Sequence, residues 1–232
     1  MRKGARLALL AGALIGFASA AEAQKVGVAP GVTVTRRTYS VPVNEAPFYN
    51  FMEKTAGQKE NDDQFVAEAL KVVPDRSKVA QHAIGRGWQA LITQRDYATA
   101  AKRFNQAFLL DPTASGVYHG FAAVAGSRFR DFEFADELFR IAARMKSPAR
   151  TLSADHGRML LIAGRPREAK PLLEQAVRDN PDWAVPKSNL AFAVLQTGDA
   201  ADACRLAAQI TGRDLTSVER DLALLKQQAK CR

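Results

Sequence analysis

Three histidines are the side chains in this sequence that could bind a metal ion together. His82, His119 and His156 recur at intervals of 37 residues, and each lies in a segment with helical apolar patterning. This interval differs from the repeat period described below, so the three rings drift around successive helices. Neighbouring helices also lie about 10 Å apart, which is too far for three of them to share one ion easily. We therefore expect histidines in the core or in a groove, and no metal site or cofactor.

No group of residues has the spacing of a catalytic or nucleotide-binding motif. The sequence lacks a Gly-x-Ser-x-Gly nucleophile motif, and neither cysteine lies near a histidine along the chain. Gly85-Arg86-Gly87 is not followed by the remaining residues of a nucleotide fingerprint. The sequence therefore predicts a non-enzymatic protein, with an unrecognised hydrolase as the least favoured alternative.

The two cysteines, Cys204 and Cys231, lie near the C-terminal end of the chain. In a helix hairpin that turns near residues 212–215, the two would lie at different distances from the turn, because a helix rises about 1.5 Å per residue. A disulfide between them requires the last residues to fold back, and it would tie down that end of the chain. Two free or intermolecular thiols are the alternative.

The composition is that of a folded, basic protein. Apolar residues make up 47% of the 232 residues and charged residues 25%, which is ordinary globular usage. Lys and Arg total 33 against 24 Asp and Glu, so the formal net charge is +9. A charge of this sign favours acidic proteins, anionic polymers, membrane surfaces or nucleic acid as partners.

Residues 1–23 have the pattern of a secretory signal peptide. Three basic residues precede an apolar run from Leu7 to Phe17, and small-residue cleavage sites follow, the last ending at Ala23. We expect cleavage after Ala23, because the run is shorter than the roughly 20 residues of an uncleaved membrane anchor. Cleavage removes three basic residues and one acidic residue, so the net charge falls from +9 to +7.

Export predicts a periplasmic location with oxidising surroundings. It separates the protein from genomic DNA and cytosolic RNA, so nucleic acid is excluded as the natural partner. No later stretch of about 18 apolar residues occurs in the sequence, so no transmembrane segment is expected after signal cleavage.

Residues 24–60 are predicted to be a flexible leader, because they contain several prolines and glycines and few sustained apolar stripes. Residues 32–43 have β-like composition, but an isolated strand is unstable without a sheet to join. A segment that orders by adding a strand to a partner is the alternative. The polar run from Asn61 to Asp63 then predicts a lead-in helix within residues 61–76, which ends at Pro74.

A repeated apolar pattern occupies most of the remaining chain. In its clearest copy, Ala100 is followed by Phe104 four positions later and by Ala107 after three more. Residues at these spacings share one helix face, so each copy is predicted to be the second helix of a hairpin. The leading alanines, at spacings of 35, 34 and 34 residues, are Ala100, Ala135, Ala169 and Ala203.

This pattern resembles the tetratricopeptide repeat family, whose unit is a pair of antiparallel helices of about 34 residues. The resemblance covers roughly residues 78–217 and implies an all-α fold, a right-handed α-solenoid of about four hairpins. Trp88 departs from the pattern, because its position in the first helix is usually small, and the 35-residue spacing leaves the frame of the second repeat open by one residue. The expected segments are 77–114, 115–149, 150–183 and 184–215, followed by a capping helix at 216–232.

The resemblance also implies a peptide-binding groove along the first helix of each hairpin. Some family members clamp a C-terminal carboxylate with lysine, asparagine and arginine, but no lysine stands at the matching positions here. The sequence therefore predicts a mixed groove with arginine charges and one phenylalanine as an apolar anchor, or else solvated helix faces without a ligand. The six candidate residues are Arg86, Gln89, His119, Arg158, Asn189 and Phe192.

Basic residues crowd the segment between residues 140 and 170. An anionic partner or an ordinary solvated surface would each account for them. The candidates for a basic face are Arg140, Arg144, Lys146, Arg150, Arg165 and Arg167.

The resemblance implies a non-catalytic periplasmic scaffold that binds a protein or peptide, as part of an envelope assembly such as pilus, secretion or cell-wall machinery. The alternative is binding of anionic envelope polymer or lipid headgroups through residues 140–170. The two hypotheses differ in their salt dependence, because salt screens contacts between exposed charges much more than it weakens apolar contacts.

Overall fold

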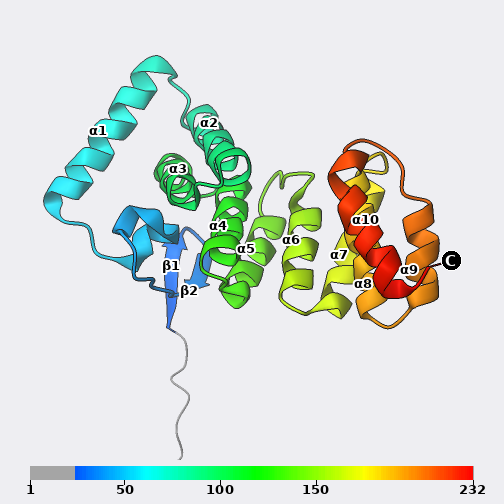
Figure 1. The fold of residues 1–232 in the computed structure, drawn as a ribbon. Coiled ribbons are helices and arrows are strands. Elements are labelled where there is room, and N and C mark those ends of the chain that lie inside the picture. Colours follow the sequence, from blue (N-terminus) through cyan, green and yellow to red (C-terminus); the bar gives the residue numbers. More distant parts are fainter. Residues whose placement is uncertain (1–23, 232) are drawn as a thin grey trace, which may run out of the picture.

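The computed structural model describes residues 24–231, so the predicted signal peptide lies outside the described residues. Within this range the chain forms ten α-helices, of which α2 to α9 pair into four hairpins that stand in one row (Figure 1). The prediction of an all-α solenoid is confirmed. A short antiparallel β-hairpin of β1 (Lys25–Ala29) and β2 (Val32–Thr35) precedes the helices.

Each hairpin pairs two consecutive helices. The first contains α2 (Arg76–Trp88), extended by the π-helical turn η3 (Gln89–Gln94), and α3 (Tyr97–Leu110). The next three pair α4 (Ser115–Arg128) with α5 (Phe132–Arg144), α6 (Leu152–Ile162) with α7 (Pro166–Asp179), and α8 (Ala184–Gln196) with α9 (Ala200–Ala208). No helix within residues 24–231 is long and apolar enough to cross a membrane.

An aspartate begins the second helix in three of the four hairpins. The side chains of Asp96, Asp131 and Asp199 each accept a hydrogen bond from the backbone N–H three residues later. This bond satisfies one free donor of the first turn and places negative charge at the positive end of the helix dipole. The helix α7 has no such cap and begins with Pro166, whose missing N–H leaves no hydrogen bond unmade at that position.

The π-helical turn η3 shifts the frame of the first hairpin. A π-turn inserts one extra residue into a helix, so the residue that meets Phe104 at the helix contact is Gly87. An added Cβ at Gly87 would lie 2.5 Å from the Phe104 ring. The Trp88 ring packs edge-on against Phe104, with 5.7 Å between the ring centroids, and lies 4.6 Å from the ring of His119 on the neighbouring α4. Positions in the first helix that are assigned by counting back from Ala100 are therefore wrong by one residue. This explains why Trp88 falls where the repeat pattern requires a small residue.

Replacing Gly120 with alanine is expected to destabilise the protein by about 1–3 kcal/mol. A Cβ at this position would lie 2.3 Å from the ring of Phe104, which is fully buried and closely packed. The matched control is Gly85→Ala, because a Cβ there meets nothing within 4 Å, so stability should rise by about 0.5–1 kcal/mol. Urea unfolding of both variants checks the pair, and a neutral Gly120→Ala variant would contradict the close helix contact.

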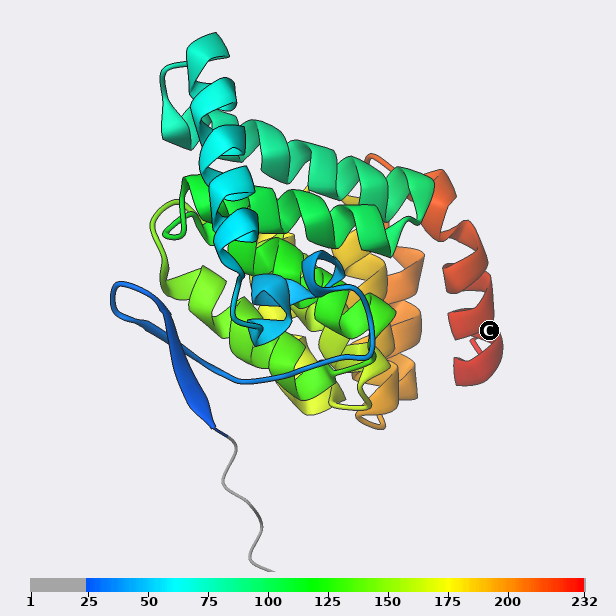
Figure 2. The ribbon, with the colours of Figure 1, turned by 90° about the vertical axis from the view of Figure 1, so that its left-hand side faces the viewer.

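Residues 25–51, predicted as part of a flexible leader, are instead ordered and packed on the first two hairpins (Figure 2). The short turns η1 (Val43–Glu45) and η2 (Pro47–Phe51) lie against α3, and β2 lies against α5. Phe48 is 7% exposed and packs among other aromatic rings, with the centroid of Phe121 at 4.7 Å and that of Phe108 at 5.3 Å. The leader is ordered because its aromatic residues complete the core of these hairpins.

Asn105 of α3 holds the leader in place by hydrogen bonds. Its side chain donates to the carbonyls of Asn44 and Ala46 at 3.1 and 2.8 Å, and it accepts from the backbone N–H of Tyr49 at 3.1 Å. These bonds satisfy a buried amide together with three backbone groups of the leader. Residues 48–51 all have positive φ angles, a strained conformation for non-glycine residues that these contacts maintain.

The helix α1 (Ala56–Val72) begins five residues before the predicted start of the lead-in helix. Thr55 caps it, because its hydroxyl accepts from the N–H of Gln58 while the Gln58 side chain accepts from the N–H of Thr55. None of the residues of α1 is buried, and the helix lies across the outside of the first hairpin (Figure 2).

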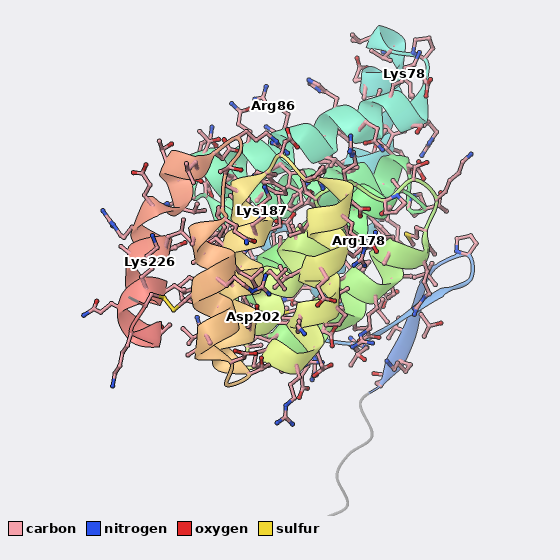
Figure 3. All side chains as sticks on the ribbon, turned by 90° about the vertical axis from the view of Figure 1, so that its right-hand side faces the viewer. Lys78, Arg86, Arg178, Lys187, Asp202 and Lys226 are labelled. Atoms are coloured by element: carbon pink, nitrogen blue, oxygen red, sulfur yellow. A yellow bond between two sulfur atoms is a disulfide. The ribbon has the colours of Figure 1, made fainter. Side chains whose placement is uncertain are left out.

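The helix α10 (Leu215–Ala229) covers the open end of the last hairpin, with Val218, Leu222 and Leu225 in a core shared with α8 and α9. The helix starts at Leu215, one residue before the predicted capping helix, and no side chain caps its first turn. Cys204 and Cys231 are joined in a disulfide (Figure 3). The left-handed conformation of Lys230 folds the last residues back toward α9, as this bridge requires.

Removing the disulfide is expected to destabilise the terminal cap by about 2–3 kcal/mol. The bridge joins positions 27 residues apart, and the helices α8 to α10 form a core cluster largely separate from that of the preceding hairpins. In repeat proteins such a loss stays local. Hydrogen exchange with and without a reductant measures this loss of stability. In the control variant Cys204→Ser/Cys231→Ser, which has no disulfide, the reductant should not change the exchange rates. Acceleration confined to α9 and α10 is expected, and equal acceleration along the whole chain would contradict the local effect.

Candidate functional site

The first helices of the first three hairpins enclose a cavity of about 720 Å³. Side chains from α2, α4 and α6 form its walls, and Trp183, just before α8, also lines it. This volume lies within the range of about 300–1,000 Å³ that ligand pockets occupy. Its lining includes Gln81, Ile84, Trp88, His119, Lys146, Thr151, Asp155 and Trp183.

A second cavity of about 330 Å³ adjoins the first between the same helices. The two cavities share Trp88, Ile92 and Asp155, and together they are called the groove below. The second cavity adds Arg158 and Ile162 from α6, and also Arg130 from the turn after α4. Trp88 lies where the two cavities meet, because the insertion in η3 directs it toward α4.

Two buried ring nitrogens in the lining of the groove have no hydrogen-bond partner within residues 24–231. His119 is 1% exposed, and its Nε2 lies 3.0 Å from the carboxylate of Asp155. A carboxylate accepts hydrogen bonds, so Nε2 carries a proton toward Asp155, and Nδ1 on the other side of the ring has no hydrogen-bond partner. The Nε1–H group of Trp183 is a buried donor without an acceptor. Buried polar groups are nearly always satisfied, so these two atoms indicate a ligand or ordered water in the groove.

The charges of the groove are mostly positive. Arg130, Arg158 and Lys146 line it and form no ion pair with any residue in the range 24–231. The two lining carboxylates already have protein partners, since Asp155 contacts His119 and Asp111 accepts a hydrogen bond from the Thr113 hydroxyl. The groove therefore has three cationic groups without an ion pair, and each of its two carboxylates has a hydrogen-bond partner in the described part of the chain.

Of the six residues predicted to line the groove, the structure brings together His119 and Arg158. Arg86 lines a different cavity between α1, α2 and α3, and it projects from the edge of the molecule (Figure 3). The shift caused by η3 moves Arg86 and Gln89 away from the groove side of the first hairpin. Asn189 and Phe192 lie on α8 outside both cavities, where Asn189 is buried and Phe192 packs on the C-terminal core.

The candidates for a basic face do not form one surface. Lys146 lines the groove, and Arg150 donates a hydrogen bond to the backbone carbonyl of Asp179. Arg140 and Arg165 both pair with the carboxylate of Asp136, which lies outside the basic segment of the sequence. Arg144 and Arg167 remain exposed and form no ion pair among the described residues. Because some of these basic side chains are paired with Asp136 and the others lie on separate surfaces, little continuous cationic surface remains for an extended polyanion.

Asp136 of α5 is the centre of an ionic network that connects the second hairpin to the third. Its carboxylate accepts from His156 Nε2 at 2.7 Å, from Arg140 Nε at 2.9 Å and from Arg165 at 2.7 Å. Burial would raise the pKa of this carboxyl, but hydrogen bonds from the two arginines and the histidine outweigh it and lower the pKa to about 2. Burial lowers the pKa of His156, so this ring is neutral at pH 7.

The three histidines do not converge. His82 lines the cavity beside α1, His119 lies in the groove and His156 belongs to the Asp136 network. Within residues 24–231, no three histidine, cysteine, aspartate or glutamate side chains are grouped in a way that could hold a metal ion.

Residues 160–228 match the family model described as tetratricopeptide repeat. Among solved structures, the chain is similar to that of Pseudomonas aeruginosa pilF, with 23% identity and a TM-score of 0.58 over 67% of this chain and 71% of that one. It is also similar to TTC0263, a TPR protein of Thermus thermophilus, with 19% identity and a TM-score of 0.50 over 76% of this chain and 92% of that one. A search of curated proteins finds no match.

At these identities the likeness to solved structures shows the fold alone. The family match adds the sequence pattern of the third hairpin's last helix, the fourth hairpin and α10. Residues 160–228 therefore match the tetratricopeptide repeat by sequence, and the preceding hairpins share the paired-helix fold and the recurring alanines.

Proposed function

We propose that the protein is a non-catalytic scaffold that binds a polypeptide segment of a partner in the groove. The observation that carries the proposal is the pair of buried, unpartnered ring nitrogens, His119 Nδ1 and Trp183 Nε1, in the lining of one cavity of about 720 Å³. A peptide backbone carries both hydrogen-bond donors and hydrogen-bond acceptors, so it can satisfy both ring nitrogens. Trp88 between the two cavities supplies the aromatic surface on which binding energy concentrates in protein interfaces.

We also propose that the protein acts in the periplasm, exported by residues 1–23 and cleaved after Ala23. The disulfide between Cys204 and Cys231 supports an oxidising compartment, because such bonds rarely persist in the cytosol. Repeat proteins of this family and size serve pilus, secretion or cell-wall machinery, and the proposed partner is a component of such an envelope assembly. Fractionation followed by N-terminal sequencing tests this part: a periplasmic protein beginning at Gln24 is expected, and a cytosolic protein that retains residues 1–23 would contradict it.

Site-directed photo-cross-linking in the native envelope tests the groove. A cross-linking amino acid at Gln81, exposed in the lining of the groove, should capture a defined partner, whereas the same group at Gln175 on α7 should not. Trp88→Ala should abolish the capture from Gln81 without changing the helical circular dichroism spectrum. Equal capture from both positions, or capture that persists in Trp88→Ala, would contradict binding in the groove.

A further inference from the structure

We propose that the groove selects peptide segments in which an acidic side chain lies next to an apolar one. The apolar side chain packs on Trp88, Ile92 and Ile162 in the second cavity, and the carboxylate pairs with Arg130 and Arg158. This inference rests on the proposed function, because it specifies the chemistry of the polypeptide that the groove takes.

The apolar part of the selection comes from two isoleucines that the fold leaves uncovered. Ile92 of η3 is 66% exposed and Ile162 at the end of α6 is 53% exposed, although most of the large apolar side chains in residues 24–231 are buried or half-buried. Both line the second cavity together with the indole of Trp88. Covering this surface with one apolar side chain removes it from water, which favours binding by about 25 cal/mol per Å².

The acidic part of the selection comes from the two arginines at the same cavity. Arg130 and Arg158 have no carboxylate partner in the range 24–231, while nearby arginines such as Arg128 do. The one acidic residue in the lining, Asp155, already holds His119. A guanidinium beside apolar surface binds a carboxylate by charge-assisted hydrogen bonds that can be bidentate, and a basic peptide would meet two like charges instead.

The proposed carboxylate is that of an aspartate or glutamate side chain, and the C-terminus of a partner is the other source of this group. Both sources present the same group, so the experiment must separate them. A display library in which each random dodecapeptide has its C-terminus fused to the carrier offers side-chain carboxylates only. A second library with free C-termini offers both sources.

Selection of both libraries against the full mature protein tests the inference. The wild-type protein should enrich aspartate or glutamate next to leucine, isoleucine or phenylalanine in the first library. Enrichment confined to terminal residues of the second library would assign the carboxylate to a chain end and overturn the side-chain preference. Enrichment of basic residues, or of apolar residues without acids, would overturn the pairing with the arginines.

A charge-reversed variant provides the matched comparison. Arg130→Glu/Arg158→Glu should lose the acidic preference while it keeps the apolar one, and it should bind a selected peptide at least about tenfold more weakly. Arg86→Glu changes an exposed arginine of α2 outside the groove and should leave the selection unchanged. Because neither groove arginine forms an ion pair in the range 24–231, the double variant should retain the thermal unfolding midpoint of the wild type.

The same selections distinguish failure of the inference from failure of the proposed function. If peptides bind and Trp88→Ala abolishes their binding, but acids are not enriched, the groove binds polypeptide and the acidic preference is wrong. If Trp88→Ala has no effect on the selected peptides, binding occurs elsewhere and the proposed function itself is contradicted.

Discussion

Replacing Phe48 with alanine is expected to lower the free energy of unfolding by about 3–5 kcal/mol, the cost of removing a large aromatic side chain from a well-packed core. The ring is 7% exposed and contacts aromatic residues of α3, α4 and α5, among them Phe108, Phe121 and Phe134. Alanine at this position keeps the positive φ of the turn, so the loss measures packing more than backbone strain.

Met52→Ala is the matched control for this variant. Met52 lies four residues later in the same leader but is 52% exposed, so its truncation should change stability by no more than about 0.5 kcal/mol. Urea unfolding at pH 7 measures both variants. A loss below about 1 kcal/mol for Phe48→Ala would mean that the leader does not belong to the folded core.

A second measurement shows which helices lose stability in Phe48→Ala. Phe48 belongs to the core cluster of the first three hairpins, whereas α8 to α10 form another cluster. Stability in repeat proteins is a sum of local terms and interfaces between neighbours. Hydrogen exchange in Phe48→Ala should therefore accelerate most strongly in α3, α4 and α5 and least in α10.

The order of the leader could not be predicted from its composition, because composition reports only what a segment does alone. Prolines and glycines favour a flexible chain, but in the structure the segment packs over the first two hairpins. Glu45 pairs with Arg128 at 2.8 Å and with Lys102 at 3.0 Å, two residues that are distant in sequence. The sequence does contain one signal, since Phe48, Tyr49 and Phe51 are an unusual density of aromatic residues for a linker.

The solenoid was predictable because each hairpin is specified locally. In the first three hairpins, the alanines and the phenylalanine or leucine between them mark a helix face within eight residues. In three of the four hairpins, an aspartate marks the start of the same helix. Such signals do not depend on which residues lie opposite. The groove was less predictable, because its residues come from three hairpins and from the turns between them.

Trp88 shows why the sequence predicts the wrong groove residues in the first hairpin. The count from Ala100 assumes 3.6 residues per turn throughout, and the π-turn η3 breaks this assumption by one residue. Tryptophan at a position that packing requires to be small, with Gly87 directly before it, is the sign of the shift. When the count is corrected by one residue, the positions that face the groove are those of Gln81 and Trp88, in place of Arg86 and Gln89.

The sequence of residues 140–170 overestimates the unpaired positive charge of this segment, because it does not show the partners that the fold supplies. Asp136 lies four residues before its first arginine, so a count restricted to residues 140–170 omits the acid that pairs with both Arg140 and Arg165. Charge pairing across helices is a property of the fold and is not visible in a window of sequence.

Asp136→Asn is expected to destabilise the protein by about 2–3 kcal/mol at pH 7, because the carboxylate is buried while both arginines that pair with it remain partly exposed. The asparagine side chain has one oxygen instead of two and presents an N–H₂ group to donors. It can therefore accept from His156 and Arg140 or from Arg165, but not from all three. Glu168→Gln is the control, because it removes a charge from the same Arg165 at an exposed position, where the loss should stay below about 1 kcal/mol.

The dependence on pH identifies the ionised carboxylate as the cause. The pKa of Asp136 is about 2 in the folded protein and about 3.9 in an unfolded chain, so its contribution is complete above pH 4 and disappears as the pH falls toward 2. The pKa of His156 is lowered by burial, so below about pH 6.5 the unfolded chain binds this proton more readily than the folded one and stability begins to fall. Urea unfolding between about pH 7.5 and pH 2 should show both stages in the wild type. Only the loss between about pH 4 and pH 2 should shrink in Asp136→Asn, and parallel curves for the two proteins would show that the charge of Asp136 does not stabilise the contact between the second and third hairpins.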